Sequence, residues 1–326
     1  MKQLMNVTFA PHIRSSMDTF KIMFFVIISL LPAVIISIVN YGLYALTLYA
    51  VCIVSAVFLE HIFCKIQGRK STINDLSAVL TGLLLALTLP PDLPLWAAFI
   101  GVFFAIIVGK MVFGGIGQNP FNPALTGRMV LLISFPALMT SFQKPLYSNI
   151  DALSGATMLG NAKTDLSAYG IINHINIDYH QLLISAGGSL GEISPLALII
   201  GGLFLMYKRI ISWHIPVSFT GTVFVFTFIL NSIDYNITIS PYSHIISGGL
   251  LLGAFFMATD YSTSPMYWTG KIIFGIGCGV LTVCIRVYGG YPEGTGFAIL
   301  IMNAFTPILD KFFRPKVFGD RDEELF

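Results

Sequence analysis

Long apolar segments separated by short polar stretches make up most of this chain. Crossing a bilayer core takes about 20 predominantly apolar residues per helix, and the pattern predicts about ten such spans. The third and eighth are short and rich in Gly and Thr, so we expect them to be broken or re-entrant. The predicted spans cover residues 21–39, 43–63, 76–90, 94–113, 123–140, 191–207, 213–232, 243–258, 269–288 and 293–313. The pattern therefore predicts an all-α integral membrane protein.

Composition agrees with this fold class. Of the 326 residues, 55% are hydrophobic and only 10% are charged, whereas soluble domains carry about 25% charged residues. A water-soluble globule is therefore excluded. The net charge of +2, with no run of basic residues, gives no basis for nucleic-acid binding. The polar lead from Met1 to Thr19 lacks the apolar core of a signal peptide, so we expect the first span to serve as its own insertion signal.

The basic residues predict an orientation. Cytoplasmic loops carry an excess of Lys and Arg. With ten spans and both termini in the cytoplasm, all of the 18 basic residues except Lys144, Lys163 and Arg286 fall on the cytoplasmic side. The polar segment 141–190 then lies outside the cell. We expect a multi-pass protein of the bacterial inner or plasma membrane.

The two halves of the chain each supply five predicted spans. Since five is odd, the halves must be oppositely oriented, as in inverted-repeat transporters. Similar sequences support the repeat: 80–85 (LTGLLL) is echoed by 246–251 (ISGGLL), and 114–115 by 289–290. Glycines that only allow close helix packing are the alternative explanation. The predicted organisation is a five-helix repeat in 1–140, an external loop in 141–190 and a second five-helix repeat in 191–326.

The external loop contains the heptapeptide 151–157, Asp-Ala-Leu-Ser-Gly-Ala-Thr. Gly155 and Ala156 leave the hydroxyl of Thr157 unshielded, so another enzyme could reach it. The segment resembles the sequence D-x-x-[ST]-G-A-T, at which flavin transferases attach FMN to the threonine through a phosphoester. Taken alone, the heptapeptide favours an ordinary Ser/Gly turn, because short motifs recur by chance; the rest of the chain reverses that preference.

A second distinctive segment, 114–128 (GGIGQNPFNPALTGR), follows the fourth span. Its two Asn-Pro steps disfavour helix at the asparagines, while Pro123 is suited to begin the next helix. Non-helical backbone at a membrane face is tolerated where it is buried in protein or lines a cavity. Asn119 and Asn122, in so apolar a setting, favour a binding site over a plain helix connection.

These segments are part of a resemblance that covers nearly the whole chain. The chain resembles the family of the D subunit of the Rnf ion-translocating ferredoxin:NAD⁺ oxidoreductase complex. It is more distantly similar to the B subunit of the Na⁺-translocating NADH:quinone reductase. The matching blocks, in order, are 10–12 (APH), 75–77 (DLS), 114–128, 154–157 (SGAT), 188–194 (GSLGEIS), 215–218 (IPVS), 258–260 (ATD), 289–293 (GGYPE) and 303–307 (NAFTP). The short polar lead favours the Rnf member.

This resemblance implies a membrane flavoprotein. Thr157 would carry covalent FMN, attached by a flavin transferase. The residues that would serve attachment or local fit are Asp151, Ser154, Gly155 and Ala156. Electrons would pass between ferredoxin and NAD⁺ through neighbouring subunits, among them a G subunit with a second covalent FMN. Their transfer would drive Na⁺ or H⁺ out of the cell.

The resemblance also implies a non-covalent riboflavin between the halves, nearer the cytoplasm. The candidates to line its site are Asn119, Asn122 and Asp260, because the predicted repeat places both segments at one face. No nicotinamide-binding motif is present: no G-x-G-x-x-G follows a strand. The chain is thus expected to be one subunit of an oxidoreductase complex without a complete active site of its own.

Ionisable residues within membrane spans are functional candidates by default. Here Glu60, Asp75, Glu192, Asp260 and Glu293 all fall near predicted span ends. We expect Glu60 and Asp75 to be solvated or to face lipid headgroups. For Asp260 and Glu192, a functional role and a solvated one are equally consistent with the sequence. The spacing of these residues predicts no deep carboxylate relay.

Cysteines and histidines add no metal site. Neither a C-x-x-C pair nor an H-E-x-x-H occurs. The cysteines, all within or at the ends of apolar segments, are expected to be buried small hydrophobes; they are Cys52, Cys64, Cys278 and Cys284.

Two other functions fit part of the sequence. An inverted-repeat secondary transporter or channel without a redox cofactor would share the composition, the repeat and the interrupted spans. A purely structural membrane scaffold for redox subunits would keep the fold and lack the flavin. Thr157 separates the three, since a transporter has no need of an exposed S-G-A-T sequence outside the membrane.

Overall fold

A computed structural model describes residues 17–69, 72–142, 159–160, 163–164, 188–234, 238–291 and 293–314. Within these ranges the chain forms helices and turns and no strand. The helices of the first half are α1 (Thr19–Tyr41), α2 (Leu43–Ile66), the 3₁₀ turn η1 (Ile73–Asp75), α3 (Ser77–Thr88), α4 (Leu95–Phe103), the π-helix η2 (Phe104–Met111), α5 (Pro123–Ser134) and α6 (Pro136–Thr140). This confirms the all-α prediction for the described residues.

The second half is also helical where it is described. Its helices are α9 (Pro195–Tyr207), α10 (His214–Ile233), α11 (Pro241–Ile246), α12 (Leu250–Leu252), the π-helix η3 (Gly253–Met257), α13 (Trp268–Tyr288) and α14 (Thr295–Phe312). Among the described residues, four helices are long and apolar enough to cross a membrane by themselves: α1, α2, α10 and α13. Shorter apolar helices of 10–17 residues are α3, α4 continued by η2, α5 and α9.

Two predicted spans are interrupted or short, as their glycine content indicates. The third is the 12-residue helix α3, which begins after Leu76 in a left-handed conformation. The eighth is broken between α11 and α12, where Gly248 and Gly249 both have positive φ. Positive φ is readily available to glycine and costly for other residues.

Proline and a polar cap residue begin several helices. Asn122 precedes Pro123 at the start of α5, and its side chain accepts a hydrogen bond from the N–H of Leu125 (3.2 Å). Ser194 caps α9 in the same way, before Pro195. Proline has no N–H, which costs nothing at the first helical position because an N–H there would have no partner within the helix. The cap side chain accepts a hydrogen bond from another of the unpaired N–H groups in the first turn. The prediction that Pro123 begins a helix is confirmed.

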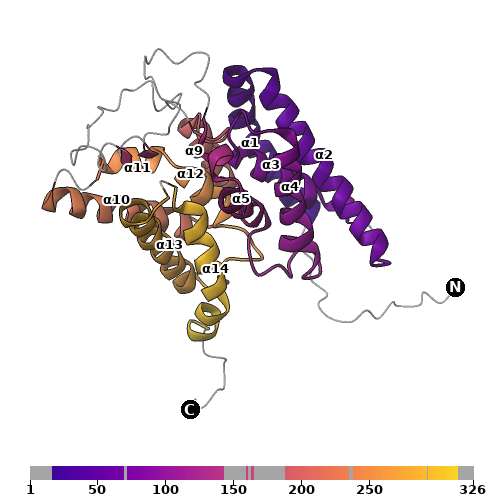
Figure 1. Cartoon of the computed structure of the whole chain (residues 1–326). Helices are drawn as coiled ribbons and strands as arrows, with labels where there is room; N and C mark the ends of the chain where they lie inside the picture. Colours follow the sequence, from indigo (N-terminus) through magenta and orange to yellow (C-terminus); the bar gives the residue numbers. More distant parts are fainter. Residues whose placement is uncertain are drawn as a thin grey trace, which may run out of the picture.

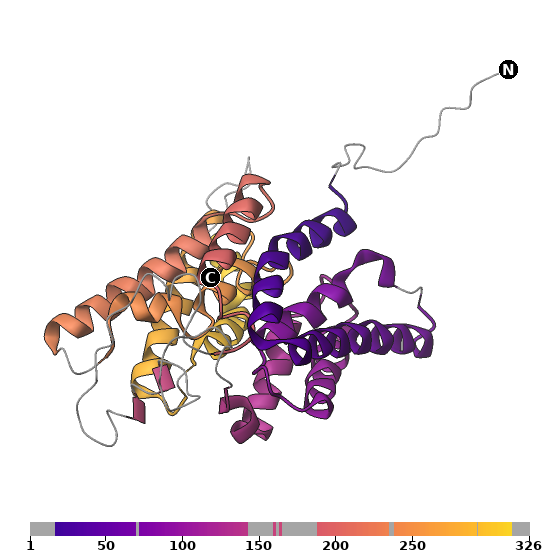
Figure 2. The ribbon, with the colours of Figure 1, turned by 90° about the horizontal axis from the view of Figure 1, so that it is seen from above.

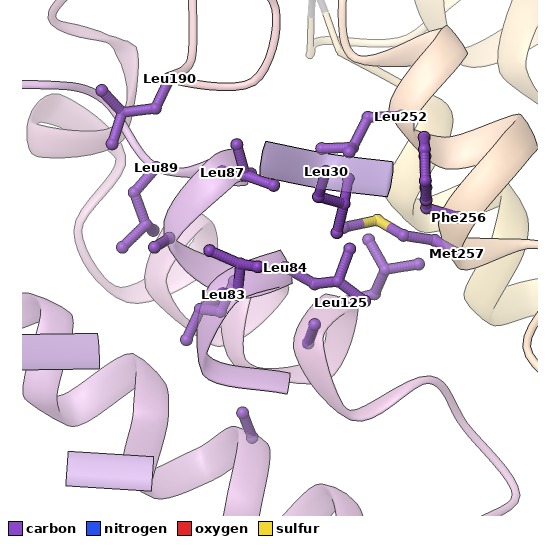
Figure 3. Close-up of a cluster of buried hydrophobic side chains, with 14 of the residues drawn as sticks. Leu30, Leu83, Leu84, Leu87, Leu89, Leu125, Leu190, Leu252, Phe256 and Met257 are labelled. Carbon is purple, nitrogen blue, oxygen red and sulfur yellow. The ribbon is translucent and has the colours of Figure 1, made fainter. Parts of the chain in front are cut away.

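Helices α1–α5 form one group and α9–α14 another, seen side by side in Figure 1 and from a second direction in Figure 2. Leucines of α1, α3 and α5 meet residues of α12 and η3 where the groups join (Figure 3). Leu30, Leu87 and Leu125 from the first group and Leu252 from the second are at most 2% exposed. The core is therefore continuous across the two groups.

Small residues set the closest approaches between helices. A Cβ on Gly201 of α9 would lie 2.3 Å from the carbonyl oxygen of Ser29 in α1. A Cβ on Gly82 of α3 would lie 2.7 Å from the carbonyl oxygen of Cys52 in α2. In lipid, where apolar surface gains little from leaving water, helices associate through such close packing. These glycines bring backbones into contact within and between the two groups.

Candidate functional site

The predicted attachment segment falls outside the described residues. It comprises Asp151, Ser154, Gly155, Ala156 and Thr157. The described chain stops at residue 142 and next includes 159–160 and 163–164. The FMN assignment to Thr157 therefore stays a prediction.

The three residues predicted to line an inner site do lie together. Asn119, Asn122 and Asp260 border one cavity between the two helix groups. Its other walls come from α1, α3, η2, η3 and the turn after α9, and include Met23, Ser77, Lys110, Ile210, Phe255 and Tyr261. The sequence predicted that segments 114–122 and 258–260 lie at the same face of the membrane, and in the structure residues of both segments line this cavity.

Backbone and amide groups join the two halves at this cavity. The amide of Asn122 donates to the carbonyl of Met257 (3.2 Å). With its amide oriented to suit the surrounding donors and acceptors, Asn303 of α14 accepts from the N–H of Asn122 (3.1 Å) and donates to the carbonyl of Thr263 (3.2 Å). Thr306 donates to the same carbonyl (2.8 Å). Both asparagines are buried, so this network fixes the cavity wall.

Asp260 lies in the turn after η3, outside the predicted spans. Its carboxylate accepts from the hydroxyls of Ser262 (3.0 Å) and Thr263 (3.4 Å). The surrounding protein raises the pKa of Asp260 above its ordinary value, because burial disfavours the charged form, and the hydroxyl hydrogen bonds oppose that change only in part.

The inner cavity suits riboflavin in chemistry but not in present size. Amides, a carboxylate and hydroxyls could pair with the polar edge of a flavin ring. The volume, however, is about 80 Å³. A buried water needs about 10–15 Å³, whereas ligand pockets span about 300–1,000 Å³. Riboflavin binding here therefore stays a prediction that requires the cavity walls to move apart.

The expectation that Glu60 is solvated is wrong. Glu60 is fully buried in α2 and forms an ion pair with Lys110 of η2 (2.6 Å). Lys110 also donates to the hydroxyl of Ser77 (2.6 Å), which donates to Asp75 (2.5 Å). Charged side chains in a protein interior are stabilised by pairing with an opposite charge. Glu60 and Lys110 lie 50 residues apart in sequence. Asp75 is half-buried as the end of this network.

The solvated position considered for Glu192 is also wrong. Glu192 is buried between the helix groups, where it accepts from the hydroxyl of Ser189 (2.7 Å) and the N–H of Gly248 (3.1 Å). Glu293 pairs with Arg128 of α5, with the two side chains 13% and 10% exposed. Two carboxylates of the second half and Arg128 of the first half thus lie in one buried cluster.

Arg286 of α13 completes this charged cluster. Its guanidinium donates to the carbonyls of His244 (2.7 Å), Ser247 (3.0 Å) and Gly248 (3.0 Å). The break between α11 and α12 leaves these carbonyls without hydrogen-bond donors from the helix backbone, and the guanidinium supplies the missing donors. The prediction placed Arg286 on the outer side and did not anticipate this burial. A Cβ on Gly248 would lie 2.5 Å from the guanidinium, which explains the glycine.

Several polar atoms in and around the cluster have no hydrogen-bond partner among the described residues. They are Nδ1 of His244, Oγ of Ser247, Nε of Arg286 and Oε1 of Glu293. Buried polar atoms are normally paired, and exceptions require an explanation such as water or an ion. The arrangement can therefore accept a proton, a water or a small cation.

A separate pocket of about 260 Å³ lies beside described residues of the segment 141–190. Residues of α5, α6 and the turn after α13 line it together with Gly160 and Thr164. Its walls include Leu132, Met139, Phe142, Lys163, Tyr291 and Glu293. The ammonium of Lys163 donates to the carbonyls of Gly289 and Tyr291 (2.9 Å to the latter). Burial lowers the pKa of Lys163. This contact ties the described part of the segment to the turn between α13 and α14.

With this geometry described, comparison with known proteins identifies the family. The NQR2, RnfD, RnfE family matches residues 6–319. The chain belongs to this family. The D subunit of the proton-translocating ferredoxin:NAD⁺ oxidoreductase complex of Clostridium ljungdahlii is 42% identical over 98% of both chains. The D subunit of the Na⁺-translocating complex of Acetobacterium woodii is 43% identical over 97% of this chain and 95% of that protein. The D subunit of an ion-translocating oxidoreductase complex of Stutzerimonas stutzeri is 42% identical over 94% of this chain and 93% of that protein.

For this member of the NQR2, RnfD, RnfE family, sequence reasoning found the inner cavity and missed the buried charges. Asn303 lies in one of the matching blocks but was assigned no role. A signal for the Glu60–Lys110 pair was present, because both charges interrupt apolar runs near the same predicted membrane face. The cluster of Glu192 and Glu293 had no comparable signal, since its members come from separate loops.

Proposed function

We propose that this chain is the membrane flavoprotein, or D, component of an ion-translocating ferredoxin:NAD⁺ oxidoreductase complex. In this proposal, FMN joined to Thr157 by a phosphoester takes part in electron transfer, and the complex exports Na⁺ or H⁺. Flavin suits the task because it passes one or two electrons, and the protein tunes it through charge and hydrogen bonds. The other subunits supply the ferredoxin and NAD⁺ sites.

The observation that carries the proposal is the complete D-x-x-S-G-A-T sequence at 151–157, in a chain similar over its whole length to subunits of such complexes. The relatives' names give the complex and its reaction. The heptapeptide gives the cofactor and its attachment atom.

We also infer ten membrane spans with both termini in the cytoplasm. Hydrogen bonds between distant segments support this, because each joins segments predicted on the same side. On the outer side, Tyr44 donates to Leu93 (2.9 Å), and the N–H of Leu190 donates to Leu89 (3.0 Å). On the inner side, Arg69 donates to Gly114 (3.0 Å). Segments on opposite sides of a bilayer could not make these contacts.

The inverted repeat of 1–140 and 191–326 is supported by how the halves pair. In a two-fold arrangement, elements near the axis contact their own counterparts. The first and fifth predicted spans of each half do so: α1 packs on α9, and α5 packs on α14. The broken eighth span and the short third span are also counterparts.

Ion translocation is consistent with the buried charged cluster. Ionisable groups inside membrane proteins usually line ion or proton paths. Glu192, Glu293 and the carbonyls at the helix break offer oxygen ligands of the kind that Na⁺ takes, and the carboxylates also accept protons. Relatives named for H⁺ and for Na⁺ are 42% and 43% identical to the chain. The transported ion is therefore left as Na⁺ or H⁺.

The test is in-gel flavin fluorescence after denaturation, with the chain co-expressed with a flavin transferase. Wild type and Thr47→Ala, a change at an exposed threonine of α2, should give a fluorescent band. Thr157→Ala should give a dark band, because it lacks the hydroxyl. A dark wild-type band, with the transferase shown to be active on another substrate, would refute covalent FMN.

A secondary transporter without a redox cofactor is the second candidate. The broken span and the buried cluster favour it, since discontinuous helices with nearby charges are typical of transporter sites. If the wild-type band is dark, ion flux should persist in vesicles that contain this chain alone. If the band is fluorescent, flux should require ferredoxin and NAD⁺ with the complete complex.

A further inference from the structure

Glu192 is a buried carboxylate without an ion pair among the described residues. Its two oxygens accept hydrogen bonds from neutral groups, the hydroxyl of Ser189 (2.7 Å) and the N–H of Gly248 (3.1 Å). Glu60, which is equally buried, lies by contrast 2.6 Å from the ammonium of Lys110. A buried charge is costly unless it is paired. Glu192 is therefore better suited than Glu60 to bind and release a proton.

Charged groups from three other segments face Glu192, and each already has a partner. Arg128 of α5 pairs with Glu293, and Arg286 of α13 donates to the carbonyls at the helix break. All three charges act on the carboxylate of Glu192. The two arginines favour its ionised form, whereas Glu293 and burial favour its protonated form. Its charge therefore depends on a balance that a change at any of these groups can alter.

A void of about 10 Å³ adjoins this carboxylate. Gly249 lines the void, and a Cβ there would lie 3.4 Å from Oε1 of Glu192 and 3.9 Å from Nη1 of Arg128. Two nearby polar atoms have no hydrogen-bond partner among the described residues: Oε1 of Glu293, which borders the void, and Oγ of the buried Ser247. A void of this size takes about one water. A metal cation there would face the guanidinium of Arg128, whereas a proton on Glu192 needs no added space, so the geometry favours a proton.

Tyr41 and Asp92 extend from Glu192 toward the predicted outer face. The hydroxyl of Tyr41, at the end of α1, donates to the carbonyl of Gly188 (3.4 Å), and a Cβ on Gly188 would lie 2.6 Å from Oε2 of Glu192. The charges of Glu192 and Asp92 both act on this hydroxyl. Asp92, in the turn between α3 and α4, is half-buried, and its Oδ1 has no partner among the described residues. Burial raises the pKa of Asp92, which makes it a better proton acceptor.

We propose that Glu192 is a proton-binding site that exchanges its proton with the outer face by way of Tyr41 and Asp92. This inference rests on the ion export in the proposed function and assigns a proton step to a named residue. On release, the hydroxyl of Tyr41 turns from Gly188 and its oxygen accepts the proton of Glu192. The hydroxyl's own proton passes to Asp92 and on to the outer water. Glu192 becomes a carboxylate, and Tyr41 ends unchanged.

The first test measures protonation of Glu192 with dicyclohexylcarbodiimide, which forms stable adducts with protonated carboxyl groups in apolar surroundings. The reagent is added to the complete complex in native membranes, and peptide mass spectrometry locates the adducts. We expect an adduct on Glu192 whose yield falls several-fold between about pH 6 and about pH 9, because only the protonated form reacts. Glu60 should remain unmodified throughout, since its ion pair with Lys110 keeps it ionised; it is the control within the same chain.

The second test asks which side supplies the proton. In right-side-out vesicles with separately set inner and outer pH, the yield on Glu192 should follow the outer pH. Tyr41→Phe, which loses only the hydroxyl, should reduce this dependence several-fold. Tyr44→Phe is the matched control, because it removes another hydroxyl that donates to a backbone carbonyl at the same predicted face. It should behave as wild type.

Three results would overturn the inference. Glu192 could stay unmodified at every pH, or its modification could follow the inner pH alone. Suppression of the adduct by Na⁺ at constant pH, with no effect of K⁺, would make Glu192 a Na⁺ site instead. A Tyr41→Phe chain with the wild-type response to outer pH would refute the route through Tyr41.

These outcomes are independent of the covalent flavin, because the reagent reacts with Glu192 whether or not flavin is attached. A dark flavin band with a modified Glu192 would refute covalent FMN alone. A fluorescent band with an unmodified Glu192 would refute the proton site alone.

Discussion

The buried ion pair of Glu60 and Lys110 predicts a specific pattern of stability in three variants. The two charges lie 2.6 Å apart and are almost completely buried. At an effective dielectric constant of about 20 their attraction is about 6 kcal/mol, and the loss of hydration offsets much of it. Removing one partner leaves the other charge buried without compensation, which typically costs about 3–5 kcal/mol. Replacing both by apolar side chains of similar size is often neutral or stabilising.

We therefore expect Glu60→Met and Lys110→Met each to be strongly destabilising, and the double variant to be close to wild type. At about 2 °C per kcal/mol for a large chain, each single change should lower the apparent unfolding temperature by about 6–10 °C. A thiol-reactive fluorophore measures this directly, because Cys52, Cys64 and Cys278 are free and buried and react only as the chain opens.

The contrast between single and double variants is the decisive result. Single variants within about 2 °C of wild type, which corresponds to a loss of only about 1 kcal/mol, would mean that the pair is not buried as described. A double variant that loses the sum of both single effects would show that the two side chains act independently, which would refute the pairing.

Three further predictions concern packing, pH and topology. Gly201→Ala should lower the free energy of unfolding by about 1–3 kcal/mol, because the added methyl group clashes with Ser29. Gly221→Ala, with open space around it, should be neutral or up to about 1 kcal/mol more stable. Equal unfolding temperatures of the two variants would contradict the close α1–α9 contact. Asp260→Asn should raise the unfolding temperature slightly at about pH 8, because a carboxyl whose folded pKa is raised destabilises the fold once it is ionised. That gain should vanish as pH falls through the raised pKa toward the ordinary value of 3.8, and a gain that grows on acidification would refute the sign. Tyr242→Cys and Tyr207→Cys, both at exposed sites, test the topology in a Cys284→Ala background. A membrane-impermeant maleimide should label Tyr242→Cys in whole cells and Tyr207→Cys only after permeabilisation. The reverse pattern would show that the chain has the opposite orientation in the membrane.

The sequence was most informative about helices. Apolar run lengths located the helical segments, because each run must hydrogen-bond its own backbone if it enters a bilayer. The interruption of the eighth predicted span was visible as Gly248 and Gly249, since glycine permits the required positive φ. The prediction that the cysteines are buried is confirmed for Cys52, Cys64 and Cys278, whereas Cys284 is half-buried.

The site was only partly predictable. Asn119, Asn122 and Asp260 could be grouped because the repeat and the orientation together place their segments at one face. The pairing of Glu293 with Arg128 joins residues 165 positions apart, and nothing local distinguishes such a charge from a solvated one at a span end. Burial of Arg286 depends on the carbonyls freed by a helix break in another segment, which is a property of tertiary structure alone.

Peptide mass spectrometry of the chain isolated from native membranes tests the central claim most directly. The account predicts that the peptide containing Thr157 carries the mass of FMN less one water, and that fragmentation places it on that threonine. The Thr157→Ala chain should lack the modification while retaining its place in the complex. An unmodified Thr157 peptide, recovered from complexes that still transfer electrons from ferredoxin to NAD⁺, would contradict the account.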